Sequence, residues 1–143
     1  MATTAEALFD FHADVANLPV ITPPFPPFRL LSPPKASEVG DEQLLRVGWP
    51  AFGSTWTAKV VRIIPGLLTE DIQTKGPFRR WRHQHQFRDV ARGRATLTDV
   101  VSFRLLPTVV GEFVEFYTVR PLLLTMFRYR HRRTRAILAN HNV

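Results

Sequence analysis

The stretch from Gly76 to Phe87, GPFRRWRHQHQF, decides how this chain is expected to fold. After the break at Gly76-Pro77 its residues alternate between large rings and charged or amide side chains. Because successive side chains on a β-strand point to opposite faces, this pattern predicts a strand with one wet and one inward face. A single solvated face is typical of an antiparallel sheet covered on one side only. The inward set is Trp81, His83, His85 and Phe87, and the outward set is Arg80, Arg82, Gln84, Gln86 and Arg88.

The sequence after this strand predicts a hairpin and a second alternating strand. Residues 89–94 have the composition of a hairpin loop, with Gly93 available for a positive φ. Residues 95–106 then alternate again and are expected to form the partner strand. The positions that share its inward parity are Leu97, Asp99, Val101, Phe103 and Leu105.

Pairing of these two strands brings an acid close to the inward histidines. If Phe87 lies opposite Leu97, Asp99 lies opposite His85, and a slip of two residues places it opposite His83 instead. Either register puts the carboxylate and an imidazole on one face, unless a one-residue bulge intervenes. Because a buried carboxylate without a partner is costly, we expect Asp99 to lie inside and to bond to one of these histidines.

Length and composition narrow the classes of protein. A chain of 143 residues is expected to form one domain, residues 1–143, with a core of its own. The chain has no cysteine, which excludes disulfides, thiol chemistry and Cys-ligated zinc and fits a cytoplasmic protein. No apolar run reaches the roughly 20 residues of a membrane helix, and no signal peptide is apparent at the start.

The net charge of +7 is unevenly distributed. Residues 1–75 hold 6 Lys and Arg against 8 Asp and Glu, and residues 76–143 hold 13 against 4. A basic half can attract nucleic acid, acidic lipid or an acidic ligand. Its arginines between Arg128 and Arg135 would spread over more than one helix face, and no nucleic-acid reading motif accompanies them. We therefore expect a solvated helix end and no specific nucleic-acid binding.

The remaining segments predict an α+β fold. Thr4 to Asp14 is expected to be a helix with Thr4 as N-cap, followed by a short turn near Ile21 and a proline-rich connector. Pro121 is expected to bend a long helix over Val110 to Asn140. The apolar stripe of that helix is predicted to be Phe113, Tyr117, Leu124, Phe127, Thr134 and Leu138. Four further strands are predicted over Phe28–Leu31, Gln43–Trp49, Ser54–Ile64 and Leu67–Thr74.

This order of elements resembles the START-like, helix-grip superfamily, and within it the bacterial ligand-binding proteins and polyketide cyclases labelled SRPBCC. The resemblance implies a curved antiparallel sheet of six to seven strands wrapped around the long C-terminal helix, with two short N-terminal helices and an elongated cavity for an apolar ligand. It rests on residues 8–12, 17–18, 21–25, 76–87, 95–99 and 127–131.

The chain departs from the family at its start. Members usually begin with a strand, and here only Met1 to Thr3 precede the first helix. The first strand is therefore very short, missing, or supplied by a neighbouring chain. A missing strand leaves an open sheet edge that invites pairing, so a homodimer through this edge is a candidate assembly.

Three functions remain open from the sequence. The first is binding of a lipid, polyketide or aromatic metabolite between sheet and helix. The second is a cyclase or dehydratase in which His83 or His85 is the general base and Asp99 orients it. The third is an interaction module that uses the sheet edge or the basic helix. The residues expected to line the cavity are Trp56, Trp81, Phe87, Val101, Phe103, Tyr117, Leu124 and Phe127.

The two histidines also have simpler explanations. His83 and His85, two residues apart on one strand face, are a permissible pair of metal ligands, but only Asp99 is a candidate third ligand. Histidines hydrogen-bonded to Asp99 in a packed interior would give the same pattern. We predict no metal and no cofactor.

Overall fold

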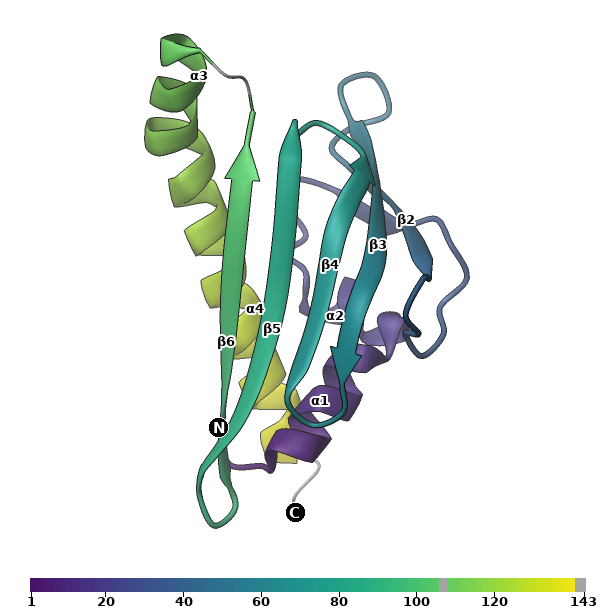
Figure 1. Ribbon diagram of the computed structural model, residues 1–143, viewed down its shortest axis with the longest axis vertical. Helices are drawn as coiled ribbons and strands as arrows, with labels where there is room; N and C mark the ends of the chain where they lie inside the picture. The colour runs from purple at the N-terminus through teal and green to yellow at the C-terminus, as the bar shows by residue number, and fades with distance from the viewer. Residues whose placement is uncertain (106–107, 141–143) are drawn as a thin grey trace.

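The computed structural model describes residues 1–105 and 108–140, and Figure 1 shows its ribbon. A six-stranded antiparallel sheet runs in chain order, β1 to β6, as the alternating patterns predict. Each predicted strand begins and ends within a few residues of the observed strand. The predicted strand end at Leu106 lies outside the described residues. The strands are β1 (Phe28–Leu30), β2 (Glu42–Val47), β3 (Ser54–Ile64), β4 (Leu68–Lys75), β5 (Arg80–Ala91) and β6 (Arg94–Arg104).

Short helices precede the sheet and one long helix follows it. The first begins where predicted, because the hydroxyl oxygen of Thr4 accepts a hydrogen bond from the backbone N–H of Ala7. The N-terminal helices are α1 (Ala5–Ala13), the 3-10 turn η1 (Val15–Asn17) and α2 (Leu18–Ile21). The C-terminal helix is continuous through α3 (Val109–Val114), the π-helical segment η2 (Glu115–Val119) and α4 (Arg120–Asn140).

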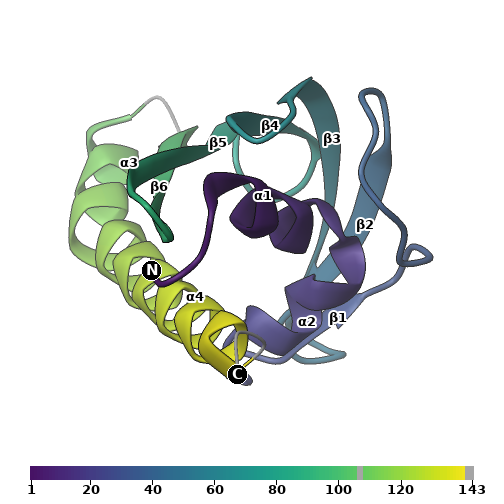
Figure 2. The same ribbon diagram turned by 90° about the horizontal axis from the view of Figure 1, so that it is seen from below.

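The layers follow from the curvature of the sheet. Figure 2 shows the strands bending around α1 and α2, with α4 across the open side of the curve. This arrangement is the helix-grip architecture that the sequence predicted. One end of the concave face is closed by an apolar core in which α1 packs on β5 and β6. Its buried members are Ala5, Leu8, Phe9, Phe87, Ala95 and Leu97.

The hairpin between β5 and β6 is tighter than the sequence indicated. Both strands extend into the predicted loop, and Gly93 takes the left-handed conformation with φ of 66°. A register shift lies between Asp89 and Ala91, close to the turn. Beyond it the predicted register holds, with Phe87 opposite Leu97. The irregularity is confined to the turn and leaves the inward histidines in place.

Burial confirms the predicted faces of β5. Trp81, His83 and Phe87 are buried, and the side chain of His85 is 12% exposed. The arginines of the other parity are exposed. Gln84 is half-buried because its amide donates a hydrogen bond of 2.7 Å to the Glu70 carboxylate on the outer face.

The first strand of the family is reduced to a single bridge. Ala2 pairs with Arg94 at the beginning of β6, and Met1 exchanges two backbone hydrogen bonds with Ala95. This single bridge is compatible with each of the alternatives left open, and the choice between them stays a prediction. No other described segment pairs with the outer side of β6, so most of that edge is open.

The predicted apolar stripe of the C-terminal helix holds only in its second half. From Phe127 onward the predicted residues are buried or half-buried, but Tyr117 and Leu124 are 63% and 57% exposed. The less exposed line in the first half is Gly111, Glu115, Val119 and Leu123. The π-helical segment at Glu115–Val119 widens the turn before Pro121, which shifts the helix phase away from a regular 3.6-residue spacing.

Candidate ligand-binding site

Asp99 is the centre of a polar cluster on the concave face of the sheet. Its side chain is 6% exposed. One carboxylate oxygen accepts a hydrogen bond of 2.8 Å from Nε2 of His83, and the other bonds to Nε2 of His131 on α4. Nδ1 of His85 lies 2.6 Å from the first oxygen, at an angle outside that of a directed hydrogen bond. The predicted acid–histidine contact is confirmed, and it also connects the sheet to the helix.

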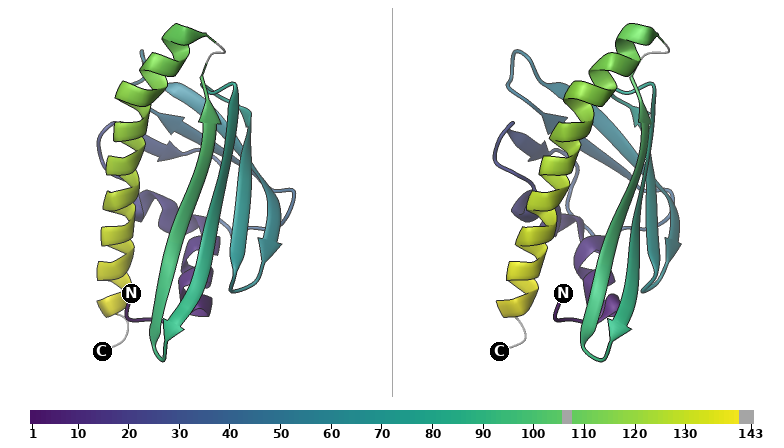
Figure 3. Two further views of the ribbon diagram at one scale, coloured as in Figure 1. Left: turned by 60° about the vertical axis from the view of Figure 1, so that its left-hand side comes forward. Right: turned by 90° about the vertical axis from the view of Figure 1, so that its left-hand side faces the viewer.

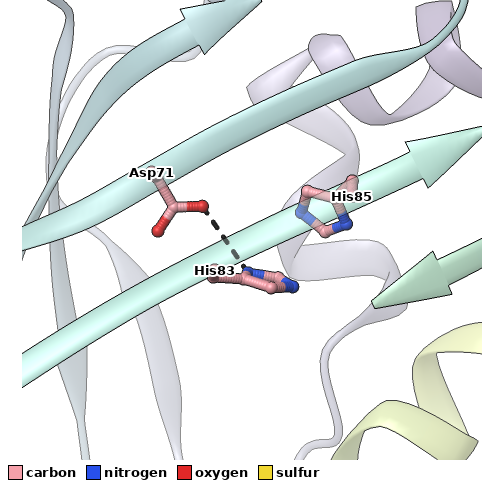
Figure 4. A group of neighbouring side chains, drawn as sticks. All are labelled: Asp71, His83 and His85. Atoms are coloured by element: carbon pink, nitrogen blue, oxygen red, sulfur yellow. Dashed lines mark ion pairs between the residues drawn. The ribbon is translucent and has the colours of Figure 1, made fainter. Parts of the chain in front are cut away.

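His83 lies between two carboxylates. Figure 4 shows the ring of His83 beside Asp71 of β4. Its Nδ1 lies 3.5 Å from a carboxylate oxygen of Asp71, and its Nε2 lies 2.8 Å from one of Asp99. Burial lowers the pKa of His83, but the hydrogen bonds to Asp71 and Asp99 outweigh it and raise the pKa above its ordinary value. A protonated imidazole has two N–H donors, one for each carboxylate.

His85 and His12 have the opposite tendency. Burial and the neighbouring His83 lower the pKa of His85, whose ring centroid is 4.1 Å from that of His83. Burial is also the main reason that the pKa of His12 on α1 falls to about 2. The rings of His12 and His85 are 5.3 Å apart, and Nε2 of His12 is 3.5 Å from the hydroxyl of the buried Thr134. The cluster therefore places an imidazole that binds its proton more tightly, His83, next to two that lose theirs more easily.

The Asp99 carboxylate remains ionised in this setting. Burial alone would raise the pKa of Asp99, but the imidazoles of His85, His131 and His83 outweigh it and hold the pKa far below its ordinary value. An ionised carboxylate bonded to a protonated ring is a satisfied arrangement for a buried charge.

An aromatic cluster adjoins the polar one toward the beginning of β5. The rings of Trp56 and Trp81 meet edge to face at 4.6 Å, and Phe78 and Phe103 are 5.6 Å apart. The indole N–H of Trp56 has no hydrogen-bond partner among the described residues. On the helix side, Phe127 places its ring 5.0 Å from that of His83. The predicted residues Trp56, Trp81, Phe103 and Phe127 therefore surround one end of the polar cluster.

Of the other predicted lining residues, Val101 lies beside the cluster and three lie elsewhere. Phe87 packs against Phe9 in the apolar core, with ring centroids 5.6 Å apart. Val101 is half-buried opposite His83 on β6. Tyr117 and Leu124 are exposed on the helix, so they remain available to a ligand that lies against it, and their role stays a prediction.

Two surface hollows lie away from these residues. One of about 440 Å³ is bounded by the proline-rich connector and Tyr129 of α4. The other, of about 550 Å³, is bounded by α1 and the turn between β3 and β4. Neither is lined by a histidine of the cluster. Both hollows are open to solvent, whereas the histidine cluster brings polar groups together where sheet and helix meet.

Asp71, His83 and His85 also have the spacing of a metal site. One ligand atom from each lies within 4.8 Å of the others. Both ring nitrogens of His83 already face carboxylates, however, and its raised pKa favours a proton over a metal at Nδ1. These three side chains are therefore better suited to sharing protons through hydrogen bonds than to binding a metal ion.

The structure adds four residues that sequence reasoning did not assign to the site: His12, Asp71, Arg130 and His131. A sequence signal existed for three of them. His12 is four residues after Leu8 on the first helix, and Arg130 and His131 follow Phe127 by three and four residues, so each shares a helix face with an apolar residue. Asp71 had none, because the apolar residues of β4, Leu68 and Ile72, have the opposite parity.

Comparison with known proteins agrees with this architecture. A family model described as polyketide cyclase / dehydrase and lipid transport matches residues 1–127. The crystal structure of protein CV1439 from Chromobacterium violaceum aligns with a TM-score of 0.68, over 96% of this chain and 90% of its own. That of TTHA0849 from Thermus thermophilus aligns with a TM-score of 0.70, over 96% and 93%.

Each of these structures is 10% identical to this chain, so the similarity shows the fold alone. No curated protein matches the chain. None of the described helices combines the length and apolar character needed to cross a membrane.

Proposed function

Because the chain belongs to the polyketide cyclase / dehydrase and lipid transport family, we propose that it binds a hydrophobic small molecule between the sheet and the C-terminal helix. A lipid, a polyketide or an aromatic metabolite has the required character. Figure 3 shows how the two elements are arranged: the helix begins beside the end of β6 and runs along the concave side of the sheet.

The observation that carries this proposal is incomplete burial on both facing surfaces. On the sheet, Trp56, Val101 and Phe103 are only half-buried. On the helix line between Glu115 and Phe127, Val119 and Leu123 are half-buried as well. A filled interior is close-packed and would cover such side chains. A ligand that lies between the two surfaces supplies the missing contacts.

The polar cluster beside these residues gives the ligand an orientation. Ligand sites are mostly apolar with a few convergent polar groups. Here those groups are Asp99 and the imidazoles around it, at the point where sheet and helix meet. An oxygen of the ligand would exchange hydrogen bonds with this cluster, and its apolar body would lie toward the aromatic rings.

Native mass spectrometry of protein purified from its own host tests the proposal directly. We expect a retained apolar ligand, and its mass identifies the class. Tryptophan emission gives a second readout, because Trp56 and Trp81 lie in the aromatic cluster whereas Trp49 is exposed on a loop. In a Trp49→Phe variant only the two cluster rings emit, and energy transfer to a bound polyene such as the methyl ester of parinaric acid should be efficient. Absence of both a retained ligand and energy transfer would contradict binding at this place.

An enzymatic role is the second candidate, and the opposed pKa shifts of His83 and His85 favour it. Neighbouring groups whose environments separate their pKa values are suited to acid and base roles. His85, with its lowered pKa, would take a proton from a carbon next to a carbonyl. His83, with its raised pKa, would give a proton to a departing hydroxyl, which leaves as water while the carbon–carbon double bond forms.

The same mass spectra separate the enzyme from the binding protein. If the protein is a dehydratase, the ligand retained by the wild type should be lighter by one water than the ligand retained by a His85→Gln variant, which keeps the substrate unchanged. If the protein only binds its ligand, the wild type and His85→Gln should retain a ligand of the same mass. In that case the imidazoles hold and orient the ligand only.

A further inference from the structure

Arg130 is directed into the protein among otherwise exposed arginines. It follows Phe127 by three residues and precedes Thr134 by four, on the helix face that meets the sheet. Its guanidinium carbon lies 5.7 Å from the centre of the Phe127 ring, and that ring contacts His83. The other arginines of this segment, Arg128, Arg132, Arg133 and Arg135, are exposed.

The Arg130 side chain is half-buried, and its contact with the Phe127 ring provides no hydrogen-bond acceptor. Within residues 1–105 and 108–140 the guanidinium forms no hydrogen bond or ion pair. An arginine side chain has five N–H donors, and donors without an acceptor in a protein interior cost free energy. Burial lowers the pKa of Arg130, against the opposing effect of Asp99 and Asp71, but an arginine stays charged at any ordinary pH.

The two nearby acids cannot supply the missing acceptor in this arrangement. Asp99 is engaged by His83, His85 and His131, and Asp71 faces Nδ1 of His83. The acceptor is therefore either solvent or a bound molecule. Arg130 is next to Phe127, whose ring also contacts His83, so Arg130 lies at the border between the polar cluster and the aromatic rings.

We propose that Arg130 receives a carboxylate at one end of the hydrophobic ligand, which makes the ligand class an apolar monocarboxylic acid. A planar carboxylate fits the guanidinium fork with two parallel hydrogen bonds. A doubly charged phosphate is disfavoured, because Asp99 and Asp71 lie close enough to act on the same guanidinium. This inference rests on the proposed function and adds the chemical end group that the site selects.

Parinaric acid and its methyl ester are the matched probes, since they share the fluorescent polyene and differ only in the charged end. We expect the wild-type protein to bind the acid about ten-fold more tightly than the ester, a difference of about 1.4 kcal/mol. Arg130→Gln should lose the preference for the acid, so that it binds acid and ester about equally. Arg132→Gln removes the same charge from an exposed position two residues away, and it should keep the preference.

Arg130→Lys keeps the positive charge but cannot form two parallel hydrogen bonds to a carboxylate. It should therefore keep only part of the preference for the acid. It also serves if Arg130→Gln is poorly folded, which circular dichroism reveals. Equal binding of acid and ester by the wild type would overturn the carboxylate assignment and leave the hydrophobic site intact. An unchanged preference in Arg130→Gln would overturn the role of Arg130. Failure of both probes to bind the wild type would instead refute the hydrophobic site itself.

Discussion

Asp99→Asn is the most informative single substitution, because it keeps the shape of the side chain and removes its charge. The carboxylate bonds to His83 at 2.8 Å and also to His131, and both bonds lie at the contact of sheet and helix. A hydrogen bond to a charged group contributes about 1.5–3 kcal/mol. His131 is partly exposed and the asparagine oxygen can retain one bond. We therefore expect a loss of about 3 kcal/mol in the free energy of unfolding near pH 6.

The loss should depend on pH in a defined direction. The pKa of His83 is raised in the folded protein, so its contribution is present below the ordinary histidine pKa and fades as pH rises through the folded value. The pKa of Asp99 is lowered, so its contribution is lost only in acid, as pH falls below the ordinary aspartate pKa. The difference between wild type and Asp99→Asn should be largest between about pH 4 and 6.5 and smaller at pH 9.

Urea unfolding at several pH values measures this difference, and NMR titration of the imidazoles measures its origin. The pKa of His83 should fall in Asp99→Asn, because a negative neighbour favours the protonated ring. Asp10→Asn is the control, since it makes the same chemical change at an exposed position on α1. Identical histidine titrations in wild type and Asp99→Asn, or a stability difference no larger than that of Asp10→Asn, would refute this account of the cluster.

The same contacts give three further predictions. Asp71→Asn should also lower the pKa of His83, because each of the two carboxylates faces one ring nitrogen and favours the protonated ring; an unchanged His83 titration in the NMR experiment contradicts this. His12 should show no protonation between pH 4 and 8, since burial lowers its pKa to about 2; a titration midpoint near 6 in its NMR signals would disprove it. The open outer edge of β6 should allow a homodimer at high concentration, and sedimentation that shows monomer at every concentration would exclude it.

The sheet was predictable because its residues alternate clearly. On β5 the large rings and the charges separate by parity, and the register with β6 followed from aligning Phe87 with Leu97. The bulge between Asp89 and Ala91 could have shifted every pair, but it lies next to the turn. Asp99 was placed correctly for the same reason.

Two features could not be predicted from periodicity. On β4 the inward position opposite His83 is Asp71, while Leu68 and Ile72 lie on the other face, so hydrophobic alternation gives the wrong parity there. In the C-terminal helix, the π-helical turn before Pro121 adds to the length of one turn and moves Tyr117 and Leu124 to the exposed side. Both departures arise from local geometry that no spacing rule contains.

The arrangement separates the source of affinity from the source of selectivity. Complete burial of a large apolar side chain contributes about 1.5–3 kcal/mol, so covering the remaining surface of a half-buried one contributes about 1 kcal/mol. Trp56, Val101, Phe103, Val119 and Leu123 would together supply roughly 5 kcal/mol of gross driving force, before the cost of ordering the ligand. The polar cluster adds little to this sum, because hydrogen bonds to ligand replace hydrogen bonds to water. Substitutions such as Phe103→Ala should therefore weaken all hydrophobic probes alike, whereas Arg130→Gln should change only their ranking.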